Sequence, residues 1–187
     1  TKRDGLEPDV FVIGKAIAGG IPTGTYGLSE SLAARILART DLDLVDMGGV
    51  GGTLAGNPFS VAAMYYTLTE LLTEENFEYM IDLATEFTEG VQNLFDKYDL
   101  PWAINQLGAR AEYRFAKPYP ITGTAAYESA DGELEDFLHL YLINRGILLT
   151  PFHNMALMCP STSREDVDRH QVVFEEAIRE LLGLVAS

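Results

Sequence analysis

The sequence has little positive charge and almost no cysteine. Its 187 residues contain 13 Lys and Arg against 28 Asp and Glu, which gives a net charge of −15 at pH 7. Binding to nucleic-acid phosphates depends on clustered Lys and Arg side chains, so this balance argues against nucleic acid as a partner. The single cysteine, Cys159, excludes an internal disulfide and a cysteine-based zinc site, and it is consistent with a reducing, cytoplasmic compartment.

Long hydrophobic runs, a signal peptide and an initiator methionine are also absent from the sequence. The apolar runs, such as residues 147–149, are far shorter than the roughly 20 residues that span a bilayer, so no membrane partner is expected. With 47% hydrophobic and 22% charged residues, the composition is typical of a globular protein. Because the chain opens at Thr1 without a methionine, we expect it to come from a longer polypeptide.

Glycine and proline separate segments that have strand and helix patterns. A β-branched and aromatic run at residues 10–13 predicts a buried strand, and Asn57 followed by Pro58 predicts the start of a buried helix. Apolar residues spaced three or four apart predict an amphipathic helix after Thr73. Further strands are expected at 102–104, 109–115 and 147–150, and further helices at 30–39, 134–145 and 164–182. This alternation of strands and helices predicts an α/β fold.

Lys15 is the first candidate functional residue. It lies just past the predicted strand and before a glycine-rich loop, where layered α/β proteins bind ligands, although a solvated lysine is the simpler interpretation. A phosphate-binding P-loop would require glycine in place of Asp9 and Ser or Thr in place of Ala16. A dinucleotide-binding fingerprint would require glycine in place of Leu54. A nucleotide-binding site is therefore disfavoured.

Two segments together carry far more information than either glycine-rich loop alone. The first reads PDVFVIGKAIAGGIPTG over residues 8–24, and the second reads GTLAGNP over residues 52–58. In this order they resemble the two signatures of class-III aminotransferases, which are fold-type-I enzymes dependent on pyridoxal phosphate (PLP). The family includes glutamate-1-semialdehyde aminomutases and ω- and β-amino-acid transaminases. Residues 158–168 also resemble the C-terminal end of this family.

The resemblance implies a fold and a domain organisation. The chain is expected to be the C-terminal part of a fold-type-I PLP transferase, with α/β architecture. Residues 1–72 would form the C-terminal portion of the PLP-binding large domain, including the end of its sheet. Residues 73–187 would form the C-terminal small domain.

The resemblance also implies roles for individual residues. Lys15 would form a Schiff base with the PLP aldehyde, and its freed amine would then move a proton between substrate and cofactor. Gly52 and Thr53 would bind the cofactor phosphate. In this family the threonine comes from the neighbouring subunit, which implies a homodimer with a shared active site. The implied reaction is a ping-pong transfer of an amino group from an amine or amino acid to an oxo acid.

Arg110 and Arg114 share one face of a predicted strand, with Glu112 between them. A solvated charged face with local pairing is the simpler interpretation. The alternative is that one guanidinium binds a substrate carboxylate through two hydrogen bonds. Residues 108–113 resemble the corresponding segment of β-amino-acid and D-aryl-amino-acid transaminases, which favours Arg110 as the substrate-binding arginine.

The three histidines lack the spacing of a metal site, so no metal is expected. His139 and His170 lie in predicted helices, where packing or surface roles predominate. His153 lies in a turn that approaches the substrate entrance in the family. Cys159 is most simply a small core residue.

The sequence matches only the C-terminal part of the family. It has no counterpart of the aspartate that pairs with the pyridine nitrogen or of the aromatic residue that stacks on the ring, so we expect this polypeptide to be inactive by itself. Two alternatives to a transaminase remain open. One is an aminomutase of the glutamate-1-semialdehyde kind, which uses the same lysine and needs no external acceptor. The other is a non-catalytic fragment or small-molecule-binding module.

Overall fold

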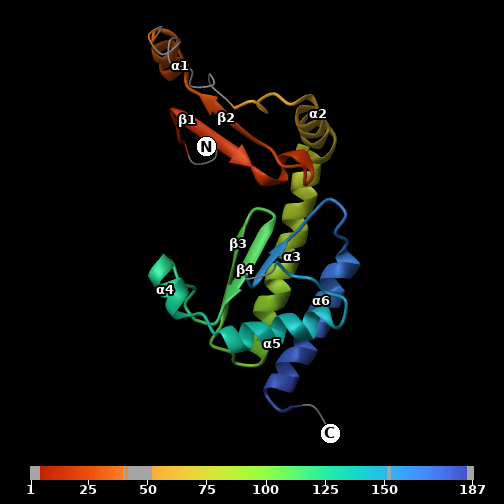
Figure 1. The fold of residues 1–187 in the computed structure, drawn as a ribbon. Coiled ribbons are helices and arrows are strands. Elements are labelled where there is room, and N and C mark those ends of the chain that lie inside the picture. The colour runs from red at the N-terminus through yellow and green to blue at the C-terminus, as the bar shows by residue number, and fades with distance from the viewer. Residues whose placement is uncertain (1–4, 40, 42–51, 151–152, 185–187) are drawn as a thin grey trace. The chain divides into compact units, whose positions relative to one another are not determined.

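The computed structural model describes residues 5–39, 41, 52–150 and 153–184 (Figure 1). By its internal contacts the chain divides into two units, Thr1–Thr73 and Glu74–Ser187. Each unit has its own antiparallel sheet, with two strands in the first unit and three in the second. Within the described ranges, no helix has the length and apolar character needed to cross a membrane.

The first unit is a β-hairpin followed by short helices. Its elements are β1 (Val10–Gly14), the 3-10 helix η2 (Lys15–Ala18), β2 (Gly24–Leu28), α1 (Glu30–Leu37), α2 (Pro58–Tyr66) and the π-helix η4 (Thr67–Leu71). Helix α1 begins where predicted, because the Ser29 hydroxyl accepts a hydrogen bond from the backbone N–H of Leu32. The strand at residues 10–13 and the two helices are thus confirmed, whereas β2 was not predicted.

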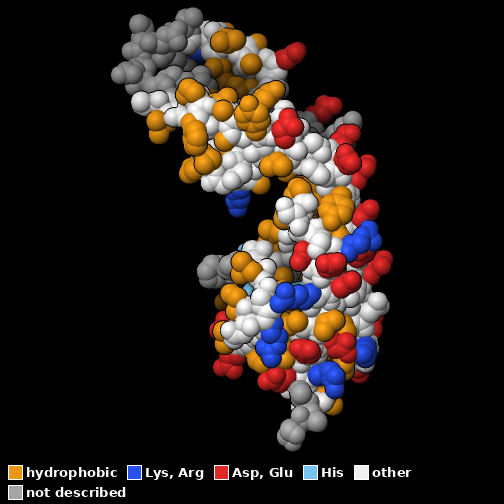
Figure 2. Space-filling view, turned by 90° about the vertical axis from the view of Figure 1, so that its right-hand side faces the viewer, with side chains coloured by type: hydrophobic (Ala, Val, Ile, Leu, Met, Phe, Trp, Pro, Cys, Tyr) orange, Lys and Arg blue, Asp and Glu red, His pale blue; other side chains and the backbone are white. Residues whose placement is uncertain are grey.

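The predicted burial of two of these elements was wrong. In β1 every residue but Gly14 is exposed, and Val12 reaches 73%. In α2 the side chain of Phe59 is 68% exposed. The physical reason is that a two-stranded sheet and a few short helices provide no second layer over these side chains within the described part of the unit. Figure 2 shows hydrophobic side chains gathered on the surface of this unit.

The second unit packs helices against a three-stranded sheet. Its elements are α3 (Glu74–Lys97), β3 (Ala103–Leu107), β4 (Arg110–Arg114), α4 (Gly123–Glu128), α5 (Gly132–Ile143), β5 (Met155–Leu157) and α6 (Arg164–Leu181). The strand order is β3-β4-β5, with β4 central. Helix α3 packs against β3, β4 and α6, and α5 packs against α6. The core contains Ala111 and Tyr113 from β4 together with apolar residues of α3 and α6.

The ends of the helices in this unit follow local sequence signals. Ser163 and Asp166 form a capping box at the start of α6, since each side chain bonds to the other residue's backbone N–H. Gly146, three residues after the last residue of α5, has φ = +78°, a conformation that favours glycine where the chain leaves a helix. Short helix α4, capped by the Thr122 hydroxyl, was not predicted.

The prediction of a strand at residues 147–150 was wrong. The backbone N–H of Ile147 bonds back to the Leu142 carbonyl and closes the end of α5, so the segment starts as part of the helix C-terminus. The third strand of the sheet is instead β5, which pairs with β4 from Arg110 to Glu112. An apolar run alone does not distinguish a strand from a loop that packs on the core.

Candidate active site

Lys15 lies at the turn between the two strands of the hairpin. Gly14, the last residue of β1, pairs with Gly24, the first residue of β2, so the intervening chain forms a loop at one end of the sheet. Lys15 opens this loop with φ = +59°, a left-handed conformation that is uncommon for residues other than glycine. Its side chain is exposed and makes no hydrogen bond or ion pair with the described residues. The amine is therefore available to a ligand.

Two buried residues hold the lysine loop in place. Ile17 and Ala18, in the 3-10 helix that Lys15 begins, are almost fully buried. This helix packs against α2 and η4. At Gly19 an added Cβ would lie 3.4 Å from the Thr67 hydroxyl oxygen, so the loop closely approaches η4. The hydrophobic anchoring of η2 thus fixes the backbone from which the lysine side chain extends.

The second motif forms a tight turn that leads into α2. The Gly52 carbonyl accepts a hydrogen bond from the Ala55 N–H at 2.8 Å, and this turn contains Thr53. The Asn57 side chain then accepts bonds from the N–H groups of Phe59 and Ser60, at 3.0 and 3.2 Å. Gly52 and Thr53 are exposed, which leaves the Thr53 hydroxyl accessible next to a helix N-terminus. Both motifs therefore belong to the first unit.

The two candidate arginines differ in their surroundings. Arg114 is half-buried and donates from Nη2 to Glu112 Oε1 at 2.7 Å. Arg110 is exposed at the start of β4, opposite Leu107 of β3 and Leu157 of β5. Among the described residues it has neither a hydrogen bond nor an ion pair. Of these two arginines, only Arg110 is both exposed and without a side-chain partner among the described residues.

Comparison with known proteins identifies the family. Residues 1–178 match the profile of the family described as aminotransferase class-III. The chain belongs to the class-III aminotransferases. Since the match covers nearly the whole chain, the resemblance of the two glycine-rich motifs is confirmed.

Solved structures of aminomutases and transaminases share the fold of this chain. A glutamate-1-semialdehyde aminomutase from Pseudomonas aeruginosa PAO1 is 44% identical with a TM-score of 0.89, over 96% of this chain and 41% of that one. A lysine-to-alanine variant of such an enzyme, solved in complex with PMP, is 42% identical with a TM-score of 0.88 and covers the same shares. An ω-transaminase from Sphaerobacter thermophilus, 23% identical with a TM-score of 0.77 over 97% of this chain and 41% of that one, shows the fold alone. The expected fold, part of a fold-type-I PLP transferase, is confirmed.

Curated relatives show the same partial coverage. Glutamate-1-semialdehyde 2,1-aminomutase 2 from Staphylococcus haemolyticus is 27% identical over 181 residues, which are 95% of this chain and 40% of that protein. The enzyme of the same name from Geobacillus kaustophilus is 29% identical over 177 residues, with coverage of 93% and 39%. The chain therefore spans about two fifths of the length of the curated relatives that it matches.

The other residues considered in the sequence, which are the three histidines and Cys159, lie in the second unit. His139 is partly exposed on α5, and His153 is exposed with Nδ1 3.7 Å from Glu112 Oε1. The prediction that Cys159 is a core residue was wrong, because it lies exposed in the turn between β5 and α6. There a hydrogen bond with the Thr162 hydroxyl lowers the pKa of the Cys159 thiol. Within the described ranges, no three potential metal-ligating side chains cluster.

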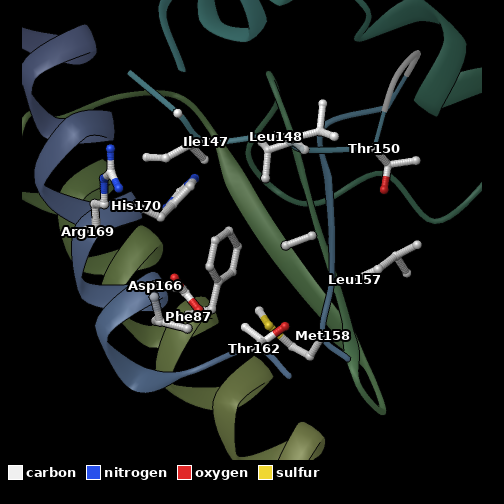
Figure 3. A pocket seen from close by; sticks show the side chains of 14 residues that line it. Phe87, Ile147, Leu148, Thr150, Leu157, Met158, Thr162, Asp166, Arg169 and His170 are labelled. Carbon is white, nitrogen blue, oxygen red and sulfur yellow. The ribbon is translucent and has the colours of Figure 1, made fainter. Parts of the chain in front are cut away.

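His170 was expected to have a packing or surface role, and it is packed, because its side chain is only 3% exposed. Its place beside a cavity, without a hydrogen-bond partner among the described residues, was not predicted. It lines a cavity between α6 and the loop that follows α5 (Figure 3). Its position three residues after Val167 and three before Val173, on the apolar face of α6, was the available signal.

Proposed function

We propose that the native protein containing this chain is a PLP-dependent transaminase in which Lys15 binds the cofactor aldehyde covalently. The observation that carries this proposal is the exposed amine of Lys15. It stands at the carboxyl end of β1, on an anchored loop, and is unpaired among the described residues. An amine held in this way, within a family signature, is suited to attack an aldehyde.

The chemistry of the described residues fits the aldehyde and the phosphate group of PLP. The Lys15 amine suits the aldehyde. The Thr53 hydroxyl and the backbone at Gly52 and Thr53 lie at an exposed turn before α2, where N–H groups suit a phosphate. Bound PLP would supply an electron sink for the substrate carbon. A homodimer would let Thr53 of one subunit serve the cofactor held by Lys15 of the other.

Beyond holding the cofactor, Lys15 would move the proton. Its four-carbon side chain is long and flexible, so the amine can reach the substrate carbon after an amino substrate has displaced it. The rigid backbone at η2 would limit the positions that the amine samples. Lys15 would thus act first as the point of covalent attachment and then as general acid and base.

Arg110 would bind the substrate carboxylate. Its guanidinium is exposed and has no partner among the described residues, whereas Arg114 is paired with Glu112. A guanidinium recognises a carboxylate through two parallel hydrogen bonds. The substrates would then be amino acids and oxo acids.

A glutamate-1-semialdehyde-type 2,1-aminomutase is the second candidate. The observation in its favour is the 44% identity to the solved aminomutase from Pseudomonas aeruginosa. A mutase moves the amino group within one carbon skeleton and needs no external acceptor. Turnover of glutamate-1-semialdehyde by the native protein without added oxo acid would favour the mutase, and strict dependence on an oxo acid would favour the transaminase.

Reduction of the native protein with borohydride in the presence of PLP, followed by peptide mass mapping, tests the role of Lys15. We expect a phosphopyridoxyl group on Lys15. Lys97 and Lys117 serve as internal controls, because their amines pair with Glu175 at 2.6 Å and with Asp96 at 3.0 Å. An unmodified Lys15, or equal modification of all three lysines, would refute the proposal.

A further inference from the structure

The second unit contains a cavity that lies outside the motifs discussed above. Its volume is about 470 Å³, which is in the range of small-molecule sites. The cavity lies between α6, the loop after α5 and the edge strand β5 (Figure 3). Apolar side chains form much of its wall, including Phe87, Ile147, Leu148 and Met158. Such a wall favours a ligand with an apolar body.

His170 is the most deeply buried polar side chain of this wall. Its ring contacts two aromatic rings, with centroids 4.5 Å from Phe87 and 5.3 Å from Phe174. Figure 3 shows the imidazole extending from α6 toward Ile147 at the cavity. Neither ring nitrogen has a hydrogen-bond partner in the described structure. Buried polar groups are nearly always paired in proteins, so a missing partner is a specific signal.

The two charged side chains of the wall are already engaged. The Asp166 carboxylate accepts hydrogen bonds from the backbone N–H and the hydroxyl of Ser163, both at 2.8 Å. The Arg169 guanidinium donates to the Arg145 carbonyl at 2.7 Å. The hydroxyl of Thr162 accepts a bond from the Cys159 N–H at 3.1 Å. Both charged side chains thus already have a hydrogen-bond partner, and their opposite charges leave the described wall of the cavity without a net charge.

The imidazole can both donate and accept a hydrogen bond. Burial lowers the pKa of His170 to about 3, so the ring is neutral at pH 7. A neutral imidazole carries one N–H donor and one acceptor nitrogen, and either tautomer can present either function to the cavity. A hydroxyl group is the matching partner, because it also donates and accepts.

We propose that this cavity binds a small neutral molecule with an apolar body, which packs on Phe87 and Ile147, and a hydroxyl group, which hydrogen-bonds to His170. The ligand differs in charge from the amino and oxo acids proposed for Lys15 and Arg110. The cavity is formed entirely by residues of the second unit, whereas Lys15 belongs to the first. The residues that line the cavity also do not include Arg110, so the proposed site shares no residue with the proposed active site, and its test does not depend on the proposed function.

Phenol and toluene form a matched pair of probes for the native protein. They share one ring, and a hydroxyl in phenol replaces the methyl group of toluene. We expect calorimetry to show saturable binding of both, with phenol bound about fivefold to tenfold more tightly through the hydrogen bond. Phenol should also shift the NMR signals of the His170 imidazole at pH 7, and Lys15→Ala should leave phenol binding unchanged.

His170→Phe removes the imidazole and keeps a planar ring in contact with Phe87 and Phe174. We expect this variant to lose the preference for phenol and to bind both probes alike. If His170→Phe does not fold, His170→Leu and the imidazole signals of the wild-type protein provide the same test. The proposal would be overturned if the wild-type protein bound phenol and toluene with equal affinity or bound neither of them. It would also be overturned if His170→Phe still preferred phenol.

Discussion

Arg114 donates a hydrogen bond from Nη2 to Oε1 of Glu112 over 2.7 Å, and the two side chains are only 21% and 11% exposed. The same carboxylate oxygen lies 3.7 Å from Nδ1 of His153. Arg110 precedes Glu112 by two residues on β4, so it shares that face of the sheet, and it is exposed. The two arginines of one strand thus differ in what they can bind.

Replacing Arg110 should weaken binding of carboxylate substrates by the native protein. Arg110→Gln removes a charged donor pair, and hydrogen bonds to charged groups contribute about 1.5–3 kcal/mol, so KM should rise roughly tenfold or more. An amine donor without a carboxylate is the matched substrate control, and its kcat/KM should not change. An equal loss of kcat/KM for both donors would show that Arg110 does not bind the substrate carboxylate.

Breaking the Arg114–Glu112 pair should affect folding instead. Arg114→Met leaves the Glu112 carboxylate largely buried without its partner, which should lower the free energy of unfolding by about 2–3 kcal/mol. Urea unfolding of the native protein measures this loss. The double variant Arg114→Met, Glu112→Gln should recover part of it, because the uncompensated charge is removed. A double variant less stable than the single one would contradict this explanation.

Local signals in the sequence were enough to predict several elements. Ser29 marked the start of α1, and Ser163 with Asp166 marked that of α6, because a cap depends on residues within one turn. The position of Lys15 after a strand was also predicted, because the strand pattern is local as well, and β1 does end at Gly14. Its left-handed backbone was not predicted, because sequence patterns do not report φ for a lysine.

The predictions that were wrong concerned features that depend on contacts with distant parts of the chain. The apolar run in β1 indicated burial, but burial requires a covering layer, and Val12 is exposed. The run at residues 147–150 indicated a strand, but the register of the sheet is set by β4, which pairs with β5 instead. Which arginine pairs with Glu112 could not be predicted either, because Arg110 and Arg114 have the same spacing from it in the sequence; the preference for Arg110 as the substrate-binding residue stays a prediction.

Replacing Lys15 with glycine should relieve strain in the backbone at this position. With φ = +59°, a residue with a Cβ is strained by about 1 kcal/mol relative to glycine. Lys15→Gly should therefore be more stable than Lys15→Ala by about 1 kcal/mol in thermal unfolding of the native protein without cofactor. Both variants lack the amine and should have lost activity equally. Equal stability of the two variants would show that the lysine is not left-handed.

The capping box of α6 should stabilise the second unit measurably. Ser163→Ala removes the hydroxyl that accepts the Asp166 N–H at 3.2 Å, so it should lower the free energy of unfolding by about 1 kcal/mol. Ser161→Ala is the matched control, since Ser161 is an exposed serine two residues earlier. The control should change stability little, and an equal loss in both variants would argue against the cap.

Because His170 is buried, the free energy of unfolding should decrease as the pH is lowered. Its pKa is lowered to about 3 in the folded chain by burial, while an unfolded histidine titrates near 6.5. The unfolded state therefore binds the extra proton as pH falls from about 6.5 toward 3, and this contribution to stability is complete above 6.5 and lost across that window. The loss should be on the order of 3–5 kcal/mol.

His170→Phe isolates this contribution, because phenylalanine does not titrate. Urea unfolding of the two proteins between pH 7 and 4 should give a steeper loss of stability for the wild type than for the variant. His139→Phe is the matched control, since His139 is partly exposed on α5, and it should keep the wild-type slope. If His170→Phe and the wild type lose stability in parallel, the imidazole is not buried without a partner, and the cavity beside it has no unpaired group to offer a ligand.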